Sequence, residues 1–300
     1  MSIVKSYSVG NGDMFYVRHN SDNFTIIDCD LNAESAAEIL DDLRIAQTGK
    51  GIHRFICTHP DEDHFGGIER LDDELPIQNF YVVKNQAIKA HDTTSFRRYR
   101  SLRDGPKAYF IKKDCTRKWM NITDESRGSS GINVLWPDLE NQQFKEALAD
   151  CDAGESYNNT SAVIRYQLEG GASFLWLGDL HTDFMDSIVD SINLPKTTVV
   201  FAAHHGRSSG KIPNSWLEKI DPQIIVIGEA PSRHLNYYTG YKTITQNRAG
   251  DVTFCCEGDV VHIYTSNPDY LNENLNLDDL HQDAYPNYLG TLSVEFEYTL

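Results

Sequence analysis

Apolar and polar positions alternate along the first part of the chain in a way that predicts strands and helices in turn. Two short apolar runs, 15–17 and 24–27, flank a polar turn and predict a pair of antiparallel strands. Residues 33–45 carry apolar side chains at helical spacing, so they predict an amphipathic helix. The apolar run 53–57 then predicts another strand, and this succession indicates an α/β chain.

The same alternation continues toward the C-terminus. Residues 65–75 are predicted to be helical and 79–84 to form a strand. The stretch 85–130 is rich in charge and in Ser, Gly and Asn and shows little periodicity, so we interpret it as an insertion. Further apolar strands are predicted at 132–136, 162–168, 174–177, 198–201, 224–227 and 260–264.

Length and composition suggest how these elements are grouped. A chain of 300 residues with 40% hydrophobic content can bury one large core, so we expect a single domain over residues 1–265. Residues 266–300 hold seven acidic side chains and no Lys or Arg, and they contain an alternating strand candidate at 291–298. This acidic C-terminal extension is expected either to add an edge strand or to contact a partner protein.

Cysteine usage and apolar run length both point to the cytoplasm. No stretch approaches the roughly 18 apolar residues that a transmembrane helix needs. The first residues also lack the apolar core of a signal peptide. The six cysteines are scattered without C-x-x-C spacing, which argues against a zinc ribbon and against a disulfide framework. We therefore expect no membrane association, a cytoplasmic location and reduced, mostly buried thiols.

The charge distribution is uneven. A net charge of −17 disfavours a polyanionic partner, because long-range repulsion slows its encounter with phosphate backbones. The segment 97–118 is different, since it holds nine basic residues against two acidic ones, with aromatic side chains between them. Arg97, Arg98 and Arg100 are therefore candidate contacts for a nucleic acid or nucleotide substrate. The alternative is a solvated helix and loop without a ligand.

The strongest chemical signal is the loop CTHPDEDHFGG at the end of the predicted strand 53–57. Imidazole nitrogens and carboxylate oxygens are ligands of zinc, manganese and iron, and alternate residues at a strand end can converge on one point. The alternative is an acidic loop whose Asp63 caps a helix that begins near Phe65. The candidate ligands in this loop are His59, Asp61, Asp63 and His64.

Two other predicted strands end in residues of the same types. The segment FLWLGDLH places Asp179 at a strand end, and TTVVFAAHHGRSSG places His204 and His205 at another. The ends of neighbouring strands are where α/β proteins keep their sites. Three strand ends that deliver His and Asp side chains therefore predict one shared metal site.

These motifs resemble those of a known family. The pattern H-x-D-x-D-H-x-G-G resembles the metallo-β-lactamase superfamily signature H-x-H-x-D-H, with Asp at the second His. Four features in order look most like the metallo-β-lactamase domain of ComEC-type competence proteins, over about residues 3–265. They are VGNGDMFYV with TIIDCD, THPDEDHFGG, NNTSAVIRY with FLWLGDL, and HHGRSS. The stretch 85–130 and the acidic extension fall outside this resemblance.

The resemblance implies an αββα four-layer sandwich with two divalent metal ions, Zn²⁺ or Mn²⁺. His59 and Asp61 would bind one ion and Asp63 and His64 the other. Asp179 would bridge the two, and His205, with His204 as the alternative, would complete the set. Superfamily members usually supply another His where this chain has Asn158 or Asn159, so Asn159 is only a possible ligand. Asp13 and Asp28 stand where the family keeps carboxylates that orient a ligand imidazole by accepting its N–H.

The implied chemistry is hydrolysis by a metal-activated water, with a phosphodiester as the natural substrate. Asp63 and His204 are predicted to take part in catalysis, His204 by donating a hydrogen bond or a proton to the reacting phosphate ester. His234 is a weaker candidate for the same role. A nuclease or nucleotide phosphodiesterase is the expected function. One alternative is hydrolysis of a carbon-centred ester, thioester or lactam, because the same fold can host different reactions. The other is a non-catalytic binding module.

Overall fold

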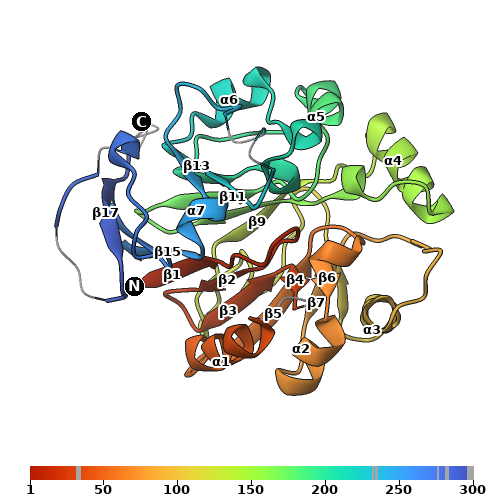
Figure 1. The fold of residues 1–300 in the computed structure, drawn as a ribbon. Coiled ribbons are helices and arrows are strands. Elements are labelled where there is room, and N and C mark those ends of the chain that lie inside the picture. The colour runs from red at the N-terminus through yellow and green to blue at the C-terminus, as the bar shows by residue number, and fades with distance from the viewer. Residues whose placement is uncertain (32–34, 232, 234–235, 276, 281–283, 296–300) are drawn as a thin grey trace.

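The computed structural model describes residues 1–31, 35–231, 233, 236–275, 277–280 and 284–295. This part of the chain has four layers: helices, a nine-stranded sheet, a six-stranded sheet and a second set of helices (Figure 1). Each sheet contains both parallel and antiparallel pairs. The predicted α/β architecture of two sheets between outer helices is confirmed.

The nine-stranded sheet has the order β17-β16-β15-β1-β2-β3-β5-β7-β8. The predicted hairpin is formed by β2 and β3, which pair antiparallel near the middle of this sheet. From β3 onward the neighbours are parallel, so β3 and β5 end at the same edge. Its strands are β1 (Ser2–Ser6), β2 (Phe15–Arg18), β3 (Asn23–Ile27), β5 (Ile52–Cys57), β7 (Phe80–Val82), β8 (Ala108–Phe110), β15 (Val252–Glu257), β16 (Val260–Thr265) and β17 (Tyr288–Ser293).

The six-stranded sheet has the order β14-β13-β12-β11-β10-β9. The strands β11, β12, β13 and β14 run parallel, so their carboxyl ends also share one edge. A further pair of two-residue strands, β4 (Cys29–Asp30) and β6 (Phe65–Gly66), lies outside both sheets. The six strands are β9 (Ile132–Trp136), β10 (Val163–Gln167), β11 (Ser173–Trp176), β12 (Val199–Phe201), β13 (Ile224–Ile227) and β14 (Thr243–Thr245).

Helices cover the outer face of each sheet (Figure 1). The nine-stranded sheet carries α1 (Ala36–Ala46), α2 (Ile68–Glu74) and α3 (Thr94–Arg103). The six-stranded sheet carries α4 (Gln142–Ala153), α5 (Thr182–Ile188) and α6 (Asn214–Ile220), and the short α7 (Gln246–Ala249) precedes β15. Within the described residues, no helix is both long and apolar enough to span a membrane.

Strand periodicity divides the apolar side chains between two cores. Phe15 and Val17 of β2 point into the core between the sheets, whereas Tyr16 joins the core beneath the helices of the nine-stranded sheet. The rings of Phe15 and Phe201 lie 4.8 Å apart and so join β2 to β12 across the sandwich. Each such buried ring contributes up to about 1.5–3 kcal/mol of transfer free energy, which stabilises the packing of the two sheets. All six cysteines are buried thiols, as expected.

Two segments without a clear sequence assignment are built into these layers. The stretch 85–130 contains α3, which packs against α2, and β8, which extends the nine-stranded sheet by parallel pairing with β7. The strand candidate at 291–298 corresponds in part to β17, which pairs with β16 as an edge strand, and residues 296–298 lie outside the described part of the chain.

Candidate metal centre

The predicted strand ends meet at one edge of the sandwich. The loop after β5 leads into the single turn η1 (Glu62–His64), and Asp179 follows β11 by three residues. His204 and His205 lie in the turn η3 (Ala203–Gly206), directly after β12. Since β5 belongs to one sheet and β11 and β12 to the other, the site joins both sheets.

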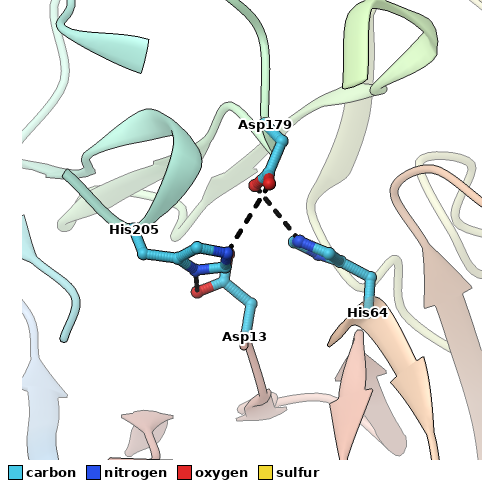
Figure 2. A group of neighbouring side chains, drawn as sticks. All are labelled: Asp13, His64, Asp179 and His205. Atoms are coloured by element: carbon cyan, nitrogen blue, oxygen red, sulfur yellow. Dashed lines mark hydrogen bonds and ion pairs between the residues drawn. The ribbon is translucent and has the colours of Figure 1, made fainter. Parts of the chain in front are cut away.

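Four side chains form the centre of this site. Each of Asp13, His64, Asp179 and His205 offers one ligand-type atom, and these atoms all lie within 4.8 Å of one another. The Nε2 atom of His64 is 3.1 Å from Asp179 Oδ1, and that of His205 is 3.5 Å from Asp179 Oδ2. Figure 2 shows the Asp179 carboxylate between the two imidazole rings.

Asp63 lies close to the same two imidazole rings, those of His64 and His205. Its Oδ2 lies 3.5 Å from His205 Nε2, and its Oδ1 lies 3.9 Å from His64 Nε2. Burial alone would raise the pKa of Asp63, but His205 and His64 lower it to about 2. The backbone brings this carboxylate close to the N-terminal loop, because Asp13 N–H donates to the Asp63 carbonyl across 3.2 Å. A Cβ on Gly12 would lie 2.6 Å from that carbonyl, so this approach requires glycine.

Several polar atoms that face the centre have no hydrogen-bond partner among the described residues. They are the Nε2 atoms of His59, His64 and His205 and the Oδ1 atom of Asp179, all of which are buried. Buried polar atoms almost always form hydrogen bonds, so a group of them without such partners at one point indicates a place for a ligand. Imidazole nitrogens and carboxylate oxygens are what a divalent transition-metal ion requires, and the residues therefore fit a metal ion.

Contacts on the far side of the rings orient them toward the centre. His64 Nδ1 lies 2.9 Å from Asp28 Oδ2, and His205 Nδ1 lies 3.1 Å from Asp13 Oδ1. Asp28 is held by Thr58, whose N–H and hydroxyl donate to its two oxygens across 2.7 Å and 2.6 Å. A carboxylate that accepts Nδ1–H leaves the Nε2 lone pair for a metal. Asp13 and Asp28 thus have the geometry that their predicted supporting role requires.

The charges around the centre favour a cation. Burial alone would lower the pKa of His64, but Asp179 and Asp28 outweigh it and raise this pKa well above its ordinary value. Asp179 and Asp13 do the same for the pKa of His205. Burial would raise the pKa of Asp179, but His64 and His205 lower it well below its ordinary value. The carboxylates therefore create a strongly negative environment that positive charge stabilises.

Comparison with known proteins identifies this arrangement. The family model of the metallo-beta-lactamase superfamily matches residues 7–241. The chain belongs to the metallo-beta-lactamase superfamily. It is also similar to the ComE operon protein 3 of Bacillus subtilis (strain 168), with 22% identity over 193 residues. That similarity covers 63% of this chain and 22% of the Bacillus protein, so the chain spans about a fifth of its relative's length.

Asp61, another residue of the motif loop, contacts residues outside the central cluster. Asp61 accepts hydrogen bonds at the same oxygen from Glu62 N–H across 2.8 Å and from Lys89 Nζ across 2.7 Å. It caps the turn η1 and is about one-third exposed.

The alternative interpretation of Asp63 as a helix cap is wrong, because α2 begins after Gly67 and has no side-chain cap.

The remaining half of the superfamily site is less complete. His59 lies with its Nε2 atom 4.0 Å from Asp179 Oδ2, and burial lowers its pKa to about 4. Asn158 and Asn159 both contact His181. The Asn158 Nδ2 atom is 3.1 Å from the ring Nε2 of His181, and Asn159 Oδ1 accepts the backbone N–H of His181 across 3.0 Å. The Asn159 oxygen is therefore already engaged beside the centre.

The two histidines of the HHG motif differ in position. His205 is part of the central cluster, whereas His204 Nε2 lies 3.7 Å from Asp179 Oδ2 and its Nδ1 lies 2.8 Å from Ser209 Oγ. Both residues have left-handed backbone conformations, with φ of 52° and 54°. Such strain persists only where the surroundings impose it, and it commonly marks functional sites. His234, the other candidate for the role of His204, lies outside the described residues.

The three arginines proposed as substrate contacts lie on α3 and are ion-paired. Arg97 and Arg100 share Asp92, and Arg98 contacts both Asp72 and Asp73. The helix begins beside the metal centre, because its capping residue Thr93 donates to Glu62 across 2.8 Å. Tyr99, one of the interleaved aromatic residues, is fully buried in the core and does not face a ligand.

Three residues near the centre were not singled out from the sequence. Thr58 links Asp28 to the motif loop, and its position directly before His59 was a usable signal. His181, which contacts both asparagines, follows Asp179 by two residues in the same motif. Lys89 carried no signal, because it lies in the stretch without periodicity.

Proposed function

We propose that this chain is a metal-dependent phosphodiesterase that acts on nucleic-acid or nucleotide phosphodiesters. The observation that carries the proposal is a group of four buried atoms without a hydrogen-bond partner, three histidine Nε2 atoms and Asp179 Oδ1, at the end of both sheets. Asp63, His64, Asp179 and His205 would hold a divalent ion there. The mixture of carboxylates and imidazoles suits manganese and zinc.

A divalent ion held there would supply two things: a lowered pKa for a bound water molecule and stabilisation of negative charge on a phosphate ester. The protein's own contribution is to orient the ligands and to hold a donor beside them. His204 is suited to that second task, since its Nδ1 is fixed by Ser209 while its Nε2 faces Asp179. We propose that His204 Nε2 donates a hydrogen bond or a proton to the substrate, as the sequence predicts.

The resemblance of the motifs to the competence-protein domain favours a phosphodiester over a carbon-centred ester. The basic segment 97–118 supports a polynucleotide, because α3 begins beside the metal loop. In this proposal Arg97 and Arg100, which share the single carboxylate of Asp92, contact phosphates that flank the scissile one.

The test is an assay of the purified chain with a chromogenic phosphodiester, an acyl ester and single-stranded DNA, with Mn²⁺ or with a chelator. We expect metal-dependent cleavage of the phosphodiester and the DNA. Asp179→Asn should lose about 100-fold or more of this activity, a few kcal/mol of transition-state stabilisation. Cleavage of the acyl ester alone would support the carbon-centred alternative. Absence of both hydrolysis and metal binding would leave the binding-module interpretation.

A further inference from the structure

Lys89 is a partly buried cation at the edge of the metal centre. Its side chain is only 11% exposed, and its Nζ lies 2.7 Å from Asp61 Oδ1. The same ammonium lies 3.8 Å from the ring centroid of Tyr157 and 5.7 Å from that of Phe65. A carboxylate and two aromatic faces therefore hold one positive charge in a fixed position.

Lys89 contacts two loops of the site, one through its ion pair with Asp61 and the other through the ring of Tyr157. Asp61 belongs to the motif loop after β5, and Tyr157 directly precedes the turn η2 (Asn158–Thr160). In η2, the Asn158 Nδ2 atom and the Asn159 Oδ1 atom contact His181. Among the described residues expected to bind a metal on this side, His59 has the one buried atom that lacks a hydrogen-bond partner, Nε2. The Thr58 hydroxyl donates to Asp28, so its oxygen accepts His59 Nδ1–H and leaves a lone pair on Nε2.

The other side of the centre has a full donor set. His64 Nε2 and His205 Nε2 are both buried and lack a hydrogen-bond partner, and the carboxylates of Asp63 and Asp179 lie 3.1–3.9 Å from them. Four donors from three strand ends are enough for one metal ion. The two sides of the centre are thus unequal in the number of donors that they can offer.

We propose that Lys89 takes the place of one of the two cations, so that this centre binds a single divalent ion. The ammonium neutralises Asp61, and Asp63, His64, Asp179 and His205 hold the ion. A second divalent ion at the other carboxylate oxygen of Asp61 would lie close to this ammonium and would be repelled by it. The inference rests on the metal-dependent function proposed above but not on the identity of its substrate.

The test is the number of Mn²⁺ ions bound per chain, measured by elemental analysis after dialysis and by calorimetric titration. The wild type should bind about one ion. Lys89→Met removes the charge but keeps most of the side-chain length, so Asp61 becomes available and a second, weaker ion should bind at millimolar Mn²⁺. The double variant Lys89→Met, Asp61→Asn should return to one ion. Lys89→Arg, which keeps the charge, should also bind one ion.

Lys84→Met is the matched control, because Lys84 is exposed and lies on the same connection between β7 and α3. It should bind one ion with unchanged affinity. Two tightly bound ions in the wild type would overturn this inference while leaving a metallohydrolase intact. A Lys89→Met protein that folds, as judged by its circular dichroism and cooperative melting, and still binds only one ion would also overturn it. No ion in the wild type would overturn the proposed function itself.

Discussion

His64 donates its Nδ1–H to the Asp28 carboxylate across 2.9 Å, and both side chains are buried at the end of β3 and β5. Asp28 has a left-handed backbone, with φ of 55°, and Thr58 N–H and hydroxyl hold its carboxylate. The chain thus maintains a strained residue behind a candidate ligand. This relationship orients His64 Nε2 toward Asp179 and fixes the tautomer that a metal needs.

Asp28→Asn is therefore expected to weaken metal binding without removing a ligand. The amide cannot accept the His64 proton as strongly and presents a donor to Thr58, so the ring loses its fixed orientation. We expect a loss of about 10- to 100-fold in affinity for Mn²⁺, measured by calorimetric titration. Asp41→Asn, at an exposed position on α1, is the control and should bind as the wild type does. Wild-type affinity in Asp28→Asn would show that Asp28 serves folding alone.

Gly178→Ala is expected to displace Asp179. Gly178 has φ of 53°, and a Cβ there would lie 2.7 Å from the Cβ and Oγ of Ser161. That hydroxyl accepts the Asp179 N–H, so a shift of Ser161 moves the metal loop directly. We expect about 1–3 kcal/mol of lost stability in urea unfolding, together with weaker metal binding.

Gly170→Ala separates backbone strain from this clash. Gly170 has a similar φ of 63°, but a Cβ there meets nothing within 4 Å. It should lose only the smaller strain energy, about 1 kcal/mol, and keep its metal affinity. Equal effects of the two substitutions on metal binding would show that the contact with Ser161 is unimportant for the site.

The basic face of α3 can be tested with a substitution that preserves folding. Arg97 and Arg100 are changed to Gln together, while Arg98 is kept because it ties α3 to Asp72 and Asp73. If each arginine contacts a phosphate, the double variant should cleave single-stranded DNA more slowly but leave the chromogenic phosphodiester unaffected. The log–log salt slope for DNA binding should fall by about 1.4, or about 0.7 for each lost contact.

Arg44 and Arg70 form the matched control pair, since they also share one carboxylate, that of Glu74, on helices of the same face. Their double change to Gln should alter neither substrate. An equal loss on DNA and on the small phosphodiester would place Arg97 and Arg100 in the site or in its support. No change on either substrate would identify α3 as a solvated helix.

The candidate ligands could be predicted because two signals coincide at each of them. His59, Asp63, His64, Asp179 and His205 all follow apolar runs that form buried strands, so the pattern that locates the strand also locates its end. Side-chain type then marks the chemistry. The edge shared by β11 and β12 follows from their parallel pairing, which a sequence suggests through alternating strands and helices. The position of the β5 end beside them depends on how the two sheets pack.

Lys89, β8 and α3 could not be predicted from the sequence. Lys89 is separated by 28 positions from its partner Asp61, and nothing local distinguishes it from an exposed lysine. β8 has three residues, which is too short to show a period. α3 does bury Phe96, Tyr99 and Leu102 at helical spacing, but its arginines hide this stripe in the composition of the segment.

His19 provides a prediction about stability that is independent of the metal centre. Its ring is buried and its Nε2 lies 2.8 Å from Thr25 Oγ1, while burial, Arg54 and Lys50 lower its pKa well below the ordinary value. The unfolded chain therefore binds a proton on His19 near pH 6.5, whereas the folded chain does so only at lower pH. Stability should fall as the pH decreases below about 6.5, by up to about 1.4 kcal/mol per pH unit until the folded-state pKa is reached. His19→Gln has no group that takes up this proton, so its stability should depend less steeply on pH, although its stability at neutral pH is lower. Urea unfolding of both proteins between about pH 5 and 7.5 measures the difference, and contributions from the other histidines cancel in it. Parallel pH profiles for the two proteins would mean that the His19 pKa is not lowered in the folded chain.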